Sequence, residues 1–245
     1  CKALSRTDVE IIEDGAIYQQ DGKIIEVGKY TDLIEKYQPN QIIGSSEDVV
    51  LPGLINCHHH VGLTPFQLGS PDYPLELWFA SRLAARNVDL YLDTLYSAFE
   101  MIESGVTTVQ HIHGWRPGPA STWLGVADQV LQAYHDIGMR SSYCFAVRDQ
   151  NHFVYEANEE FVKKLPAHIA PEIAALLKVQ EVPLQDYLDF FEHLWQKWDR
   201  QANGRIRIQL APANLHWCSD KALEKLQTYS LKYDVGMHMH LLETA

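Results

Sequence analysis

Residues 49–60 read VVLPGLINCHHH, an apolar run of the kind that forms a buried strand, and it ends in three consecutive histidines. Residues 234–243 read DVGMHMHLLE, another strand-like run that carries two histidines and then Glu243. Strand-like and helix-like segments alternate between these two stretches. Alternation of this kind predicts an α/β fold with a parallel sheet and right-handed helical crossovers.

The elements are placed by apolar periodicity and by the residues that begin and end helices. Besides 49–60, strands are predicted over 106–114, 139–147, 205–212 and 234–241. Helices are predicted over 89–105, 121–138, 183–201 and 219–233. Ser219 is expected to cap the last helix, and Ser121 or Thr122 the second, which Gly138 should end.

The first fifty residues have a different rhythm. Residues 9–30 alternate apolar and polar side chains, with turn signals at Asp14-Gly15 and Asp21-Gly22. This pattern predicts two or three short antiparallel strands, and a short helix is expected over 31–38. We therefore divide the chain into a small β part, residues 1–50, and a larger α/β domain, residues 51–245.

The positions of the histidines distinguish between two possible arrangements of the larger domain. Its five predicted strands fit either a doubly wound sheet or a (β/α) barrel. Seven of the twelve histidines lie at or just past the C-terminal ends of four of these strands. In a barrel those ends meet at one face, where active sites lie, whereas the outer strands of an open sheet end far apart. The sequence thus favours a TIM-type barrel, with five of its eight strands present.

The histidine spacing suggests a metal site. His58 and His60 point to the same side of a strand, and His59 points to the other, where packing is expected. Two imidazoles so spaced can bind one divalent ion, although a polar strand end that only forms hydrogen bonds is the alternative. His238 and His240 also share a side. One of them can complete the site, and a carboxylate just beyond can move protons to and from a metal-activated water.

Composition excludes several classes of protein. The chain has 245 residues, 46% of them hydrophobic, and a formal net charge of −12, which argues against nucleic acid or an anionic membrane as a partner. Mean hydropathy is −0.22, and no apolar run approaches the roughly 18 residues of a membrane span. Four scattered cysteines without a CxxC pair fit a reduced, cytoplasmic protein. We expect a small-molecule substrate, and self-association into a homo-oligomer stays open.

Four stretches in this order, PGLINCHHH, GVTTV, LAPANLHWCS and HMHLLET, resemble the amidohydrolase superfamily, in particular its cytosine deaminase, guanine deaminase and chlorohydrolase branch. The resemblance implies that His58, His60 and His240 bind one divalent ion, Zn²⁺ or Fe²⁺. It implies that Glu243 is the catalytic proton shuttle. It leaves His238 as an inward-facing neighbour of the ligands.

The resemblance also implies a complete architecture. Members of this superfamily have an eight-stranded barrel and a small β-sandwich built from both termini. Residues 1–50 would be the N-terminal part of that sandwich, and residues 51–245 would hold barrel strands one to five. We therefore expect these residues to belong to a longer polypeptide that supplies a strand-six histidine and a strand-eight aspartate.

The expected reaction is hydrolysis of a C–N bond, most specifically deamination of a heterocyclic amidine with release of ammonia. Hydrolysis of an amide, alkylamine or chloride on the same scaffold is an alternative, and a catalytically silent binding module is another. Substrate contacts are expected from Trp115, Arg148, Asn214 and His216. Neighbours of the metal ligands are expected at His111, His113 and His238.

Two features of the sequence refine this expectation. Where related deaminases carry an aspartate after GVTTV and a histidine after LAP, this chain has Gln110-His111 and Ala213-Asn214, which leaves the substrate open. The predicted strand over 205–211 contains no lysine that could be carboxylated to bridge two ions. We therefore predict a site with a single metal ion.

Overall fold

The structure is a computed structural model, and it describes residues 2–3, 9–60, 73–75, 77–78, 81, 88–114, 119–151, 154–181 and 183–243. Internal contacts divide the chain into two compact units, Cys1–Gly53 and Leu54–Ala245. The division falls close to the boundary predicted after residue 50. That the first unit is part of a composite sandwich stays a prediction.

The first unit contains two antiparallel strand pairs and a helix. Strand β1 (Lys2–Ala3) pairs with β2 (Val9–Glu10), and β3 (Gly15–Gln20) pairs with β4 (Lys23–Lys29), which α1 (Tyr30–Tyr37) follows. Asp21 and Gly22, which join β3 to β4, both have positive φ, 52° and 73°. Two such residues form the turn whose twist matches a hairpin. The antiparallel strands and the helix predicted here are confirmed.

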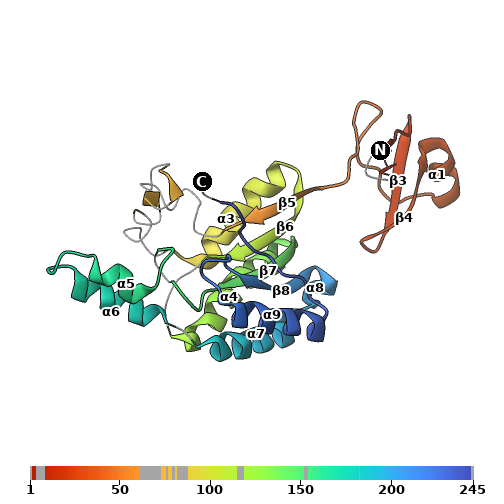
Figure 1. Ribbon diagram of the computed structural model, residues 1–245. Coiled ribbons are helices and arrows are strands. Elements are labelled where there is room, and N and C mark those ends of the chain that lie inside the picture. The colour runs from red at the N-terminus through yellow and green to blue at the C-terminus, as the bar shows by residue number, and fades with distance from the viewer. Residues whose placement is uncertain are drawn as a thin grey trace. The chain divides into compact units, whose positions relative to one another are not determined.

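The second unit is built on a four-stranded parallel sheet (Figure 1). Its strands are β5 (Leu54–His59), β6 (Val106–His113), β7 (Arg140–Val147) and β8 (Ile206–Pro212), and they lie in sequence order. Each pair of neighbours is parallel. The predicted α/β class with a parallel sheet is therefore confirmed.

Helices connect the strands and cover one face of the sheet. The main helices are α3 (Leu90–Glu103), α4 (Trp123–Ile137), α7 (Leu184–Trp198) and α9 (Asp220–Tyr233). Shorter elements are η2 (Ala120–Thr122), α5 (Asn158–Lys163), α6 (Ala170–Gln180) and α8 (Gln201–Gly204). In Figure 1, α4, α7 and α9 run along the same side of the strands. Within the described residues, no helix has the length and apolar character needed to cross a bilayer.

Helix ends follow local side-chain chemistry. The Ser219 hydroxyl accepts a hydrogen bond from Ala222 N at 3.1 Å, so this predicted cap is confirmed. Gly138, with φ 79°, ends α4 as predicted. Thr122 occupies the N-cap position of α4, as predicted, but its side chain makes no capping hydrogen bond. Thr122 belongs to the preceding 3₁₀ turn, and its Oγ1 donates instead to Pro119 O at 2.9 Å.

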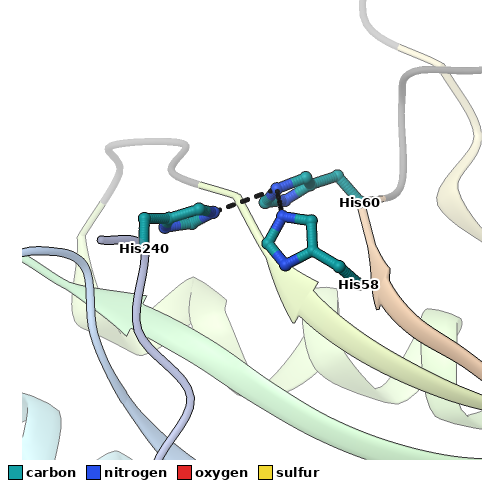
Figure 2. Close-up of side chains that lie close together, drawn as sticks. All are labelled: His58, His60 and His240. Atoms are coloured by element: carbon teal, nitrogen blue, oxygen red, sulfur yellow. Dashed lines mark hydrogen bonds between the residues drawn. The ribbon is translucent and has the colours of Figure 1, made fainter. Parts of the chain in front are cut away.

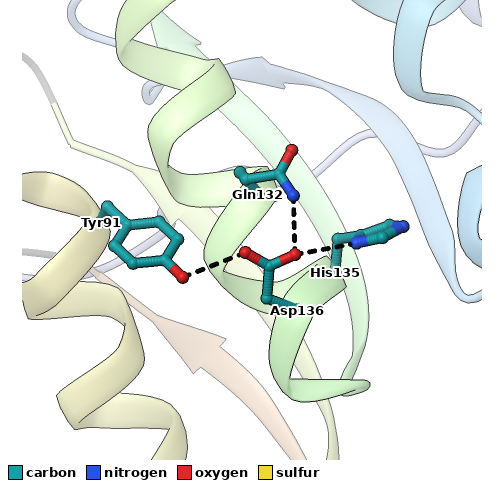
Figure 3. Close-up of polar contacts among 4 residues, drawn as sticks. All are labelled: Tyr91, Gln132, His135 and Asp136. Atoms are coloured by element: carbon teal, nitrogen blue, oxygen red, sulfur yellow. Dashed lines mark hydrogen bonds and ion pairs between the residues drawn. The ribbon is translucent and has the colours of Figure 1, made fainter.

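A polar network of exposed and half-buried side chains joins the start of α3 to the end of α4 (Figure 3). The Asp136 carboxylate accepts from His135 Nδ1 at 3.1 Å, Gln132 Nε2 at 2.7 Å and Tyr91 OH at 3.0 Å. These hydrogen bonds, that of His135 first, lower the pKa of Asp136. His135 and Asp136 therefore serve helix packing, far in the fold from the strand ends that carry the site.

The two faces of the sheet differ in size and chemistry. Side chains such as Val109, Tyr143 and Ile208 point to the helices and form the main core. The opposite face holds a small cluster of buried residues, Ile112, Cys144, Ala146, Ala211, Ala213 and Trp217. Alternation also places Gln110 and Gln209 on this second face, where Gln110 Nε2 donates to Gln209 Oε1 at 3.1 Å. The second face is the one that leads to the candidate site.

The fifth predicted strand, 234–241, forms only a single parallel bridge, between Met237 and Leu210 of β8. Leu210 N donates to Gly236 O at 3.1 Å, and His238 N donates to Leu210 O at 2.9 Å. The segment therefore follows β8 without a continuous ladder. β8 ends at Pro212, whose nitrogen carries no hydrogen and cannot donate the next bond of a ladder, and His240 N donates instead to Ala213 O at 3.1 Å. The eight-stranded barrel stays a prediction.

Candidate metal centre

Three histidines from two distant parts of the chain meet at the C-terminal end of the sheet (Figure 2). His58 lies on β5, His60 directly follows β5, and His240 lies on the segment after α9. Each ring offers one nitrogen, and these nitrogens lie within 4.8 Å of one another. His60 Nε2 is 3.0 Å from His58 Nε2 and 3.2 Å from His240 Nε2.

Two of the rings are held by backbone carbonyls. His60 Nδ1 lies 2.8 Å from Ile112 O, and His240 Nδ1 lies 3.0 Å from Ala213 O. A carbonyl oxygen only accepts, so both Nδ1 atoms carry the proton. The Nε2 lone pairs of His60 and His240 consequently face each other.

This arrangement fits a divalent cation. Two facing lone pairs repel unless a cation lies between them. A tetrahedral ion with Zn–N distances of about 2.0–2.1 Å would separate its ligand nitrogens by about 3.4 Å, close to the spacing seen here. Backbone carbonyls on the remote ring nitrogens are the usual way in which proteins orient metal-binding histidines.

The local electrostatics favour the uncharged form of His58, His60 and His238. Burial, together with the neighbouring His240 and His58, lowers the pKa of His60 to about 3. Burial is also the main reason why the pKa of His58 is lowered and that of His238 falls to about 4. Neutral imidazole is the form that binds metals, so these rings are ready to bind at neutral pH.

Glu243 lies three residues beyond His240, and its side chain is exposed. Its carboxylate opposes the lowering of the pKa of His58, so it lies within electrostatic range of the cluster. The preceding Leu242 has a left-handed backbone, φ 56°, which non-glycine residues rarely adopt. Such a turn redirects the chain directly after the histidine segment.

His238 lies beside His58. Its Nε2 is 3.0 Å from His58 Nδ1, and the two ring centroids are 5.0 Å apart. His238 does not belong to the group of three histidines whose nitrogens converge. The sequence predicted a neighbour of the ligands here but did not indicate which ring it would contact.

His111 and His113 point away from the cluster, into the helix layer. His111 is fully buried, and its Nδ1 lies 2.9 Å from the hydroxyl of Tyr134 on α4. The ring of His113 stacks on Phe145, with centroids 5.0 Å apart. His60 nevertheless contributes to lowering the pKa of His111, and the place of both histidines beside the ligands stays a prediction. Alternation along β6 turns these two residues to the side that the helices cover.

The residues predicted to contact substrate divide into different environments. The Arg148 guanidinium lies over the ring of Trp217, 3.6 Å from its centroid, and burial lowers the pKa of Arg148 to about 10. Asn214 Oδ1 accepts from His216 N at 3.0 Å and from Trp217 N at 2.9 Å, so this side chain orders its own loop. Trp115 lies outside the described residues.

His216 is exposed, and its ring contacts that of Tyr155, with centroids 4.8 Å apart. Its backbone carbonyl accepts from Asn151 Nδ2 at 2.8 Å and from Gln150 Nε2 at 3.1 Å. The loops after β7 and β8 are thereby fastened together near Arg148. Sequence reasoning missed these contacts, because main-chain carbonyls carry no residue-specific signal.

Comparison with known proteins places this geometry in a family. The model of the amidohydrolase family matches residues 49–245, and the chain belongs to this family. A 5-methylthioadenosine/S-adenosylhomocysteine deaminase of Desulforamulus reducens is 25% identical over 240 residues, which cover 96% of this chain and 46% of that relative. The chain thus spans about half the length of the curated relatives that it matches.

Solved structures share the fold at low sequence identity. A guanine deaminase from C. acetobutylicum, with bound guanine, has a TM-score of 0.66 at 17% identity and covers 98% of this chain and 50% of its own. A mutant atrazine chlorohydrolase from Arthrobacter aurescens, complexed with zinc and atraton, has a TM-score of 0.70 at 18% identity and covers 92% and 48%. These similarities establish the fold alone.

Proposed function

We propose that this protein is a metal-dependent hydrolase of C–N bonds that deaminates a heterocyclic amidine. The observation that carries the proposal is the convergence of the His58, His60 and His240 ring nitrogens, two of them aligned by backbone carbonyls. Membership of the amidohydrolase family and the deaminase names of its relatives support the same chemistry.

The residues have separate roles in this proposal. His58, His60 and His240 would hold one Zn²⁺ or Fe²⁺, and imidazole-rich ligation suits either metal. A divalent ion at such a site lowers the pKa of a bound water and supplies a nucleophile at neutral pH. Glu243 would be the carboxylate that takes a proton from the attacking water and passes it to the leaving nitrogen. General acid–base catalysis of this kind contributes about 10²–10⁴-fold in rate.

A single ion is the favoured stoichiometry. A second ion at about 3.5–4 Å would need an anionic bridge. On β8, alternation places Arg207 and Gln209 on the face that leads to the site, whereas Ile206 and Ile208 pack in the helix-side core. None of these side chains can supply a bridging oxygen anion, because arginine stays protonated and glutamine is neutral.

Arg148 is the strongest candidate for a substrate contact. Its guanidinium lies over the ring of Trp217, 3.6 Å from the ring centroid, and within electrostatic range of the Glu243 carboxylate. A planar cation fixed in this way suits an anionic or electron-rich group on the substrate. The aromatic, nitrogen-rich rings from which deaminases remove an amino group carry such groups.

The experiment uses the complete polypeptide and has two parts. Elemental analysis should find about one metal ion per chain in the wild type and a strong loss in His58→Ala and His60→Ala. His135→Ala, on the helix layer, is the matched control and should keep its metal. Normal metal content in both site variants would refute the metal assignment, and a metal-free wild type would favour a silent binding module.

The second part identifies the reaction. Aminated purines, pyrimidines, pterins and triazines are screened for ammonia release, and N-alkylated and chlorinated triazines and simple amides are tested in parallel. Ammonia release that depends on Glu243 supports deamination. Release of alkylamine, chloride or carboxylate alone would replace deamination by another hydrolysis on the same scaffold.

A further inference from the structure

His58 differs from the other two converging histidines in the partner of its remote nitrogen. The remote nitrogens of His60 and His240 meet carbonyl oxygens. His58 Nδ1 instead meets the Nε2 of another imidazole, His238, at 3.0 Å. A carbonyl can only accept a hydrogen bond, whereas a neutral imidazole nitrogen either donates or accepts. The tautomer of His58 is therefore not fixed by a backbone group and depends on His238.

Two proton arrangements satisfy this contact. In the first, His58 Nδ1–H donates to His238 Nε2, and the Nε2 lone pair of His58 faces His60. In the second, His238 Nε2–H donates to His58 Nδ1, and His58 carries its own proton on Nε2. That proton then points to His60 Nε2, only 3.0 Å away, and forms an N–H···N hydrogen bond across the site. The second arrangement removes two lone pairs from the cation position.

The position of His238 is set by the main chain. Its amide N donates to Leu210 O at 2.9 Å, and two residues later His240 N donates to Ala213 O at 3.1 Å. His238 is thus attached to β8 and His240 to the residue that directly follows β8. The ring of His238 meets that of His58 nearly edge-on, at an interplanar angle of 77°, with the two nitrogens 3.0 Å apart.

We propose that His238 is a positioning residue that accepts the Nδ1–H of His58 and so holds His58 in the tautomer able to bind a cation through Nε2. The inference rests on the proposed function only in that His58 is taken as a ligand. When the second arrangement changes into the first, one proton crosses from His238 Nε2 to His58 Nδ1. His58 releases its Nε2 proton to solvent, and His238 takes one up on Nδ1, so no net charge changes.

The test measures Zn²⁺ affinity of the complete polypeptide by competition with a chromophoric chelator. His238→Phe keeps a planar ring but has no acceptor, and it should weaken Zn²⁺ binding about 10–100-fold, the range found when an outer partner of a ligand is removed. His238→Gln places an amide oxygen near the former Nε2, and it should keep the affinity within about threefold of wild type, well inside that range. His135→Phe on α4 is the control and should change nothing.

A second readout follows ligand geometry. The visible absorption bands of the Co²⁺-loaded protein should shift in His238→Phe and return to the wild-type pattern in His238→Gln. Wild-type affinity in His238→Phe would overturn the inference. Equal weakening in both variants would also overturn it, because loss of packing rather than loss of an acceptor would then be the cause. A wild-type protein that binds no divalent metal ion would instead overturn the proposed function itself.

Discussion

Tyr134→Phe tests whether His111 belongs to the packing of the helix layer. Both side chains are fully buried, and Tyr134 OH lies 2.9 Å from His111 Nδ1. Burial raises the pKa of Tyr134 and holds that of His111 well below its ordinary value, so this is a hydrogen bond between neutral groups. Removing the hydroxyl leaves a buried ring nitrogen without this partner, which costs about 1–3 kcal/mol.

The free energy of unfolding is measured by urea denaturation of the complete protein at fixed metal loading. Tyr91→Phe is the matched control, because it removes the same hydroxyl from an exposed network in which Asp136 keeps its bonds to Gln132 and His135. Surface changes of this kind cost less than about 0.5 kcal/mol.

A double variant, His111→Phe with Tyr134→Phe, separates the bond from the packing. Replacing both partners by apolar rings should recover part of the loss, so the two single effects should not add. The reasoning fails if Tyr134→Phe costs no more than Tyr91→Phe. It also fails if Tyr134→Phe leaves stability unchanged but releases metal, since His111 would then act toward the metal centre.

Three further predictions concern the site and its pH response. Glu243→Gln should keep its metal and lose about 10²–10⁴-fold in turnover, and turnover near the wild-type value would remove the proton-shuttle role. Anomalous diffraction should show one metal peak, and two peaks at bridging distance would contradict the single-ion argument drawn from β8. Burial lowers the pKa of His111 from its ordinary value of 6.5. The contribution of the neutral His111 side chain to folding stability is therefore complete above pH 6.5. It is lost as the pH falls toward the folded pKa, at up to about 1.4 kcal/mol per pH unit. Urea titrations between about pH 7 and pH 5 should therefore show a shallower loss in His111→Phe, and an unchanged slope would count against a neutral, buried His111.

Local pattern alone determined much of this protein. Alternation along residues 58–60 predicted that His58 and His60 share a side, and the structure brings their rings together. The Asp21-Gly22 turn and the Ser219 cap also follow from short-range chemistry, since each depends on residues a few positions apart. These features need no knowledge of what packs against what.

The tertiary structure decided which side of each strand meets which partner. Alternation along a strand shows which residues share a face, but it does not show which face the helices cover. His111 and His113 could therefore be placed only after α4 was in position. The ring orientations of His60 and His240 depend on the carbonyls of Ile112 and Ala213, and every residue has such a group. The contact of His238 with His58 likewise joins positions 180 residues apart, and it exists because the segment after α9 lies along β8.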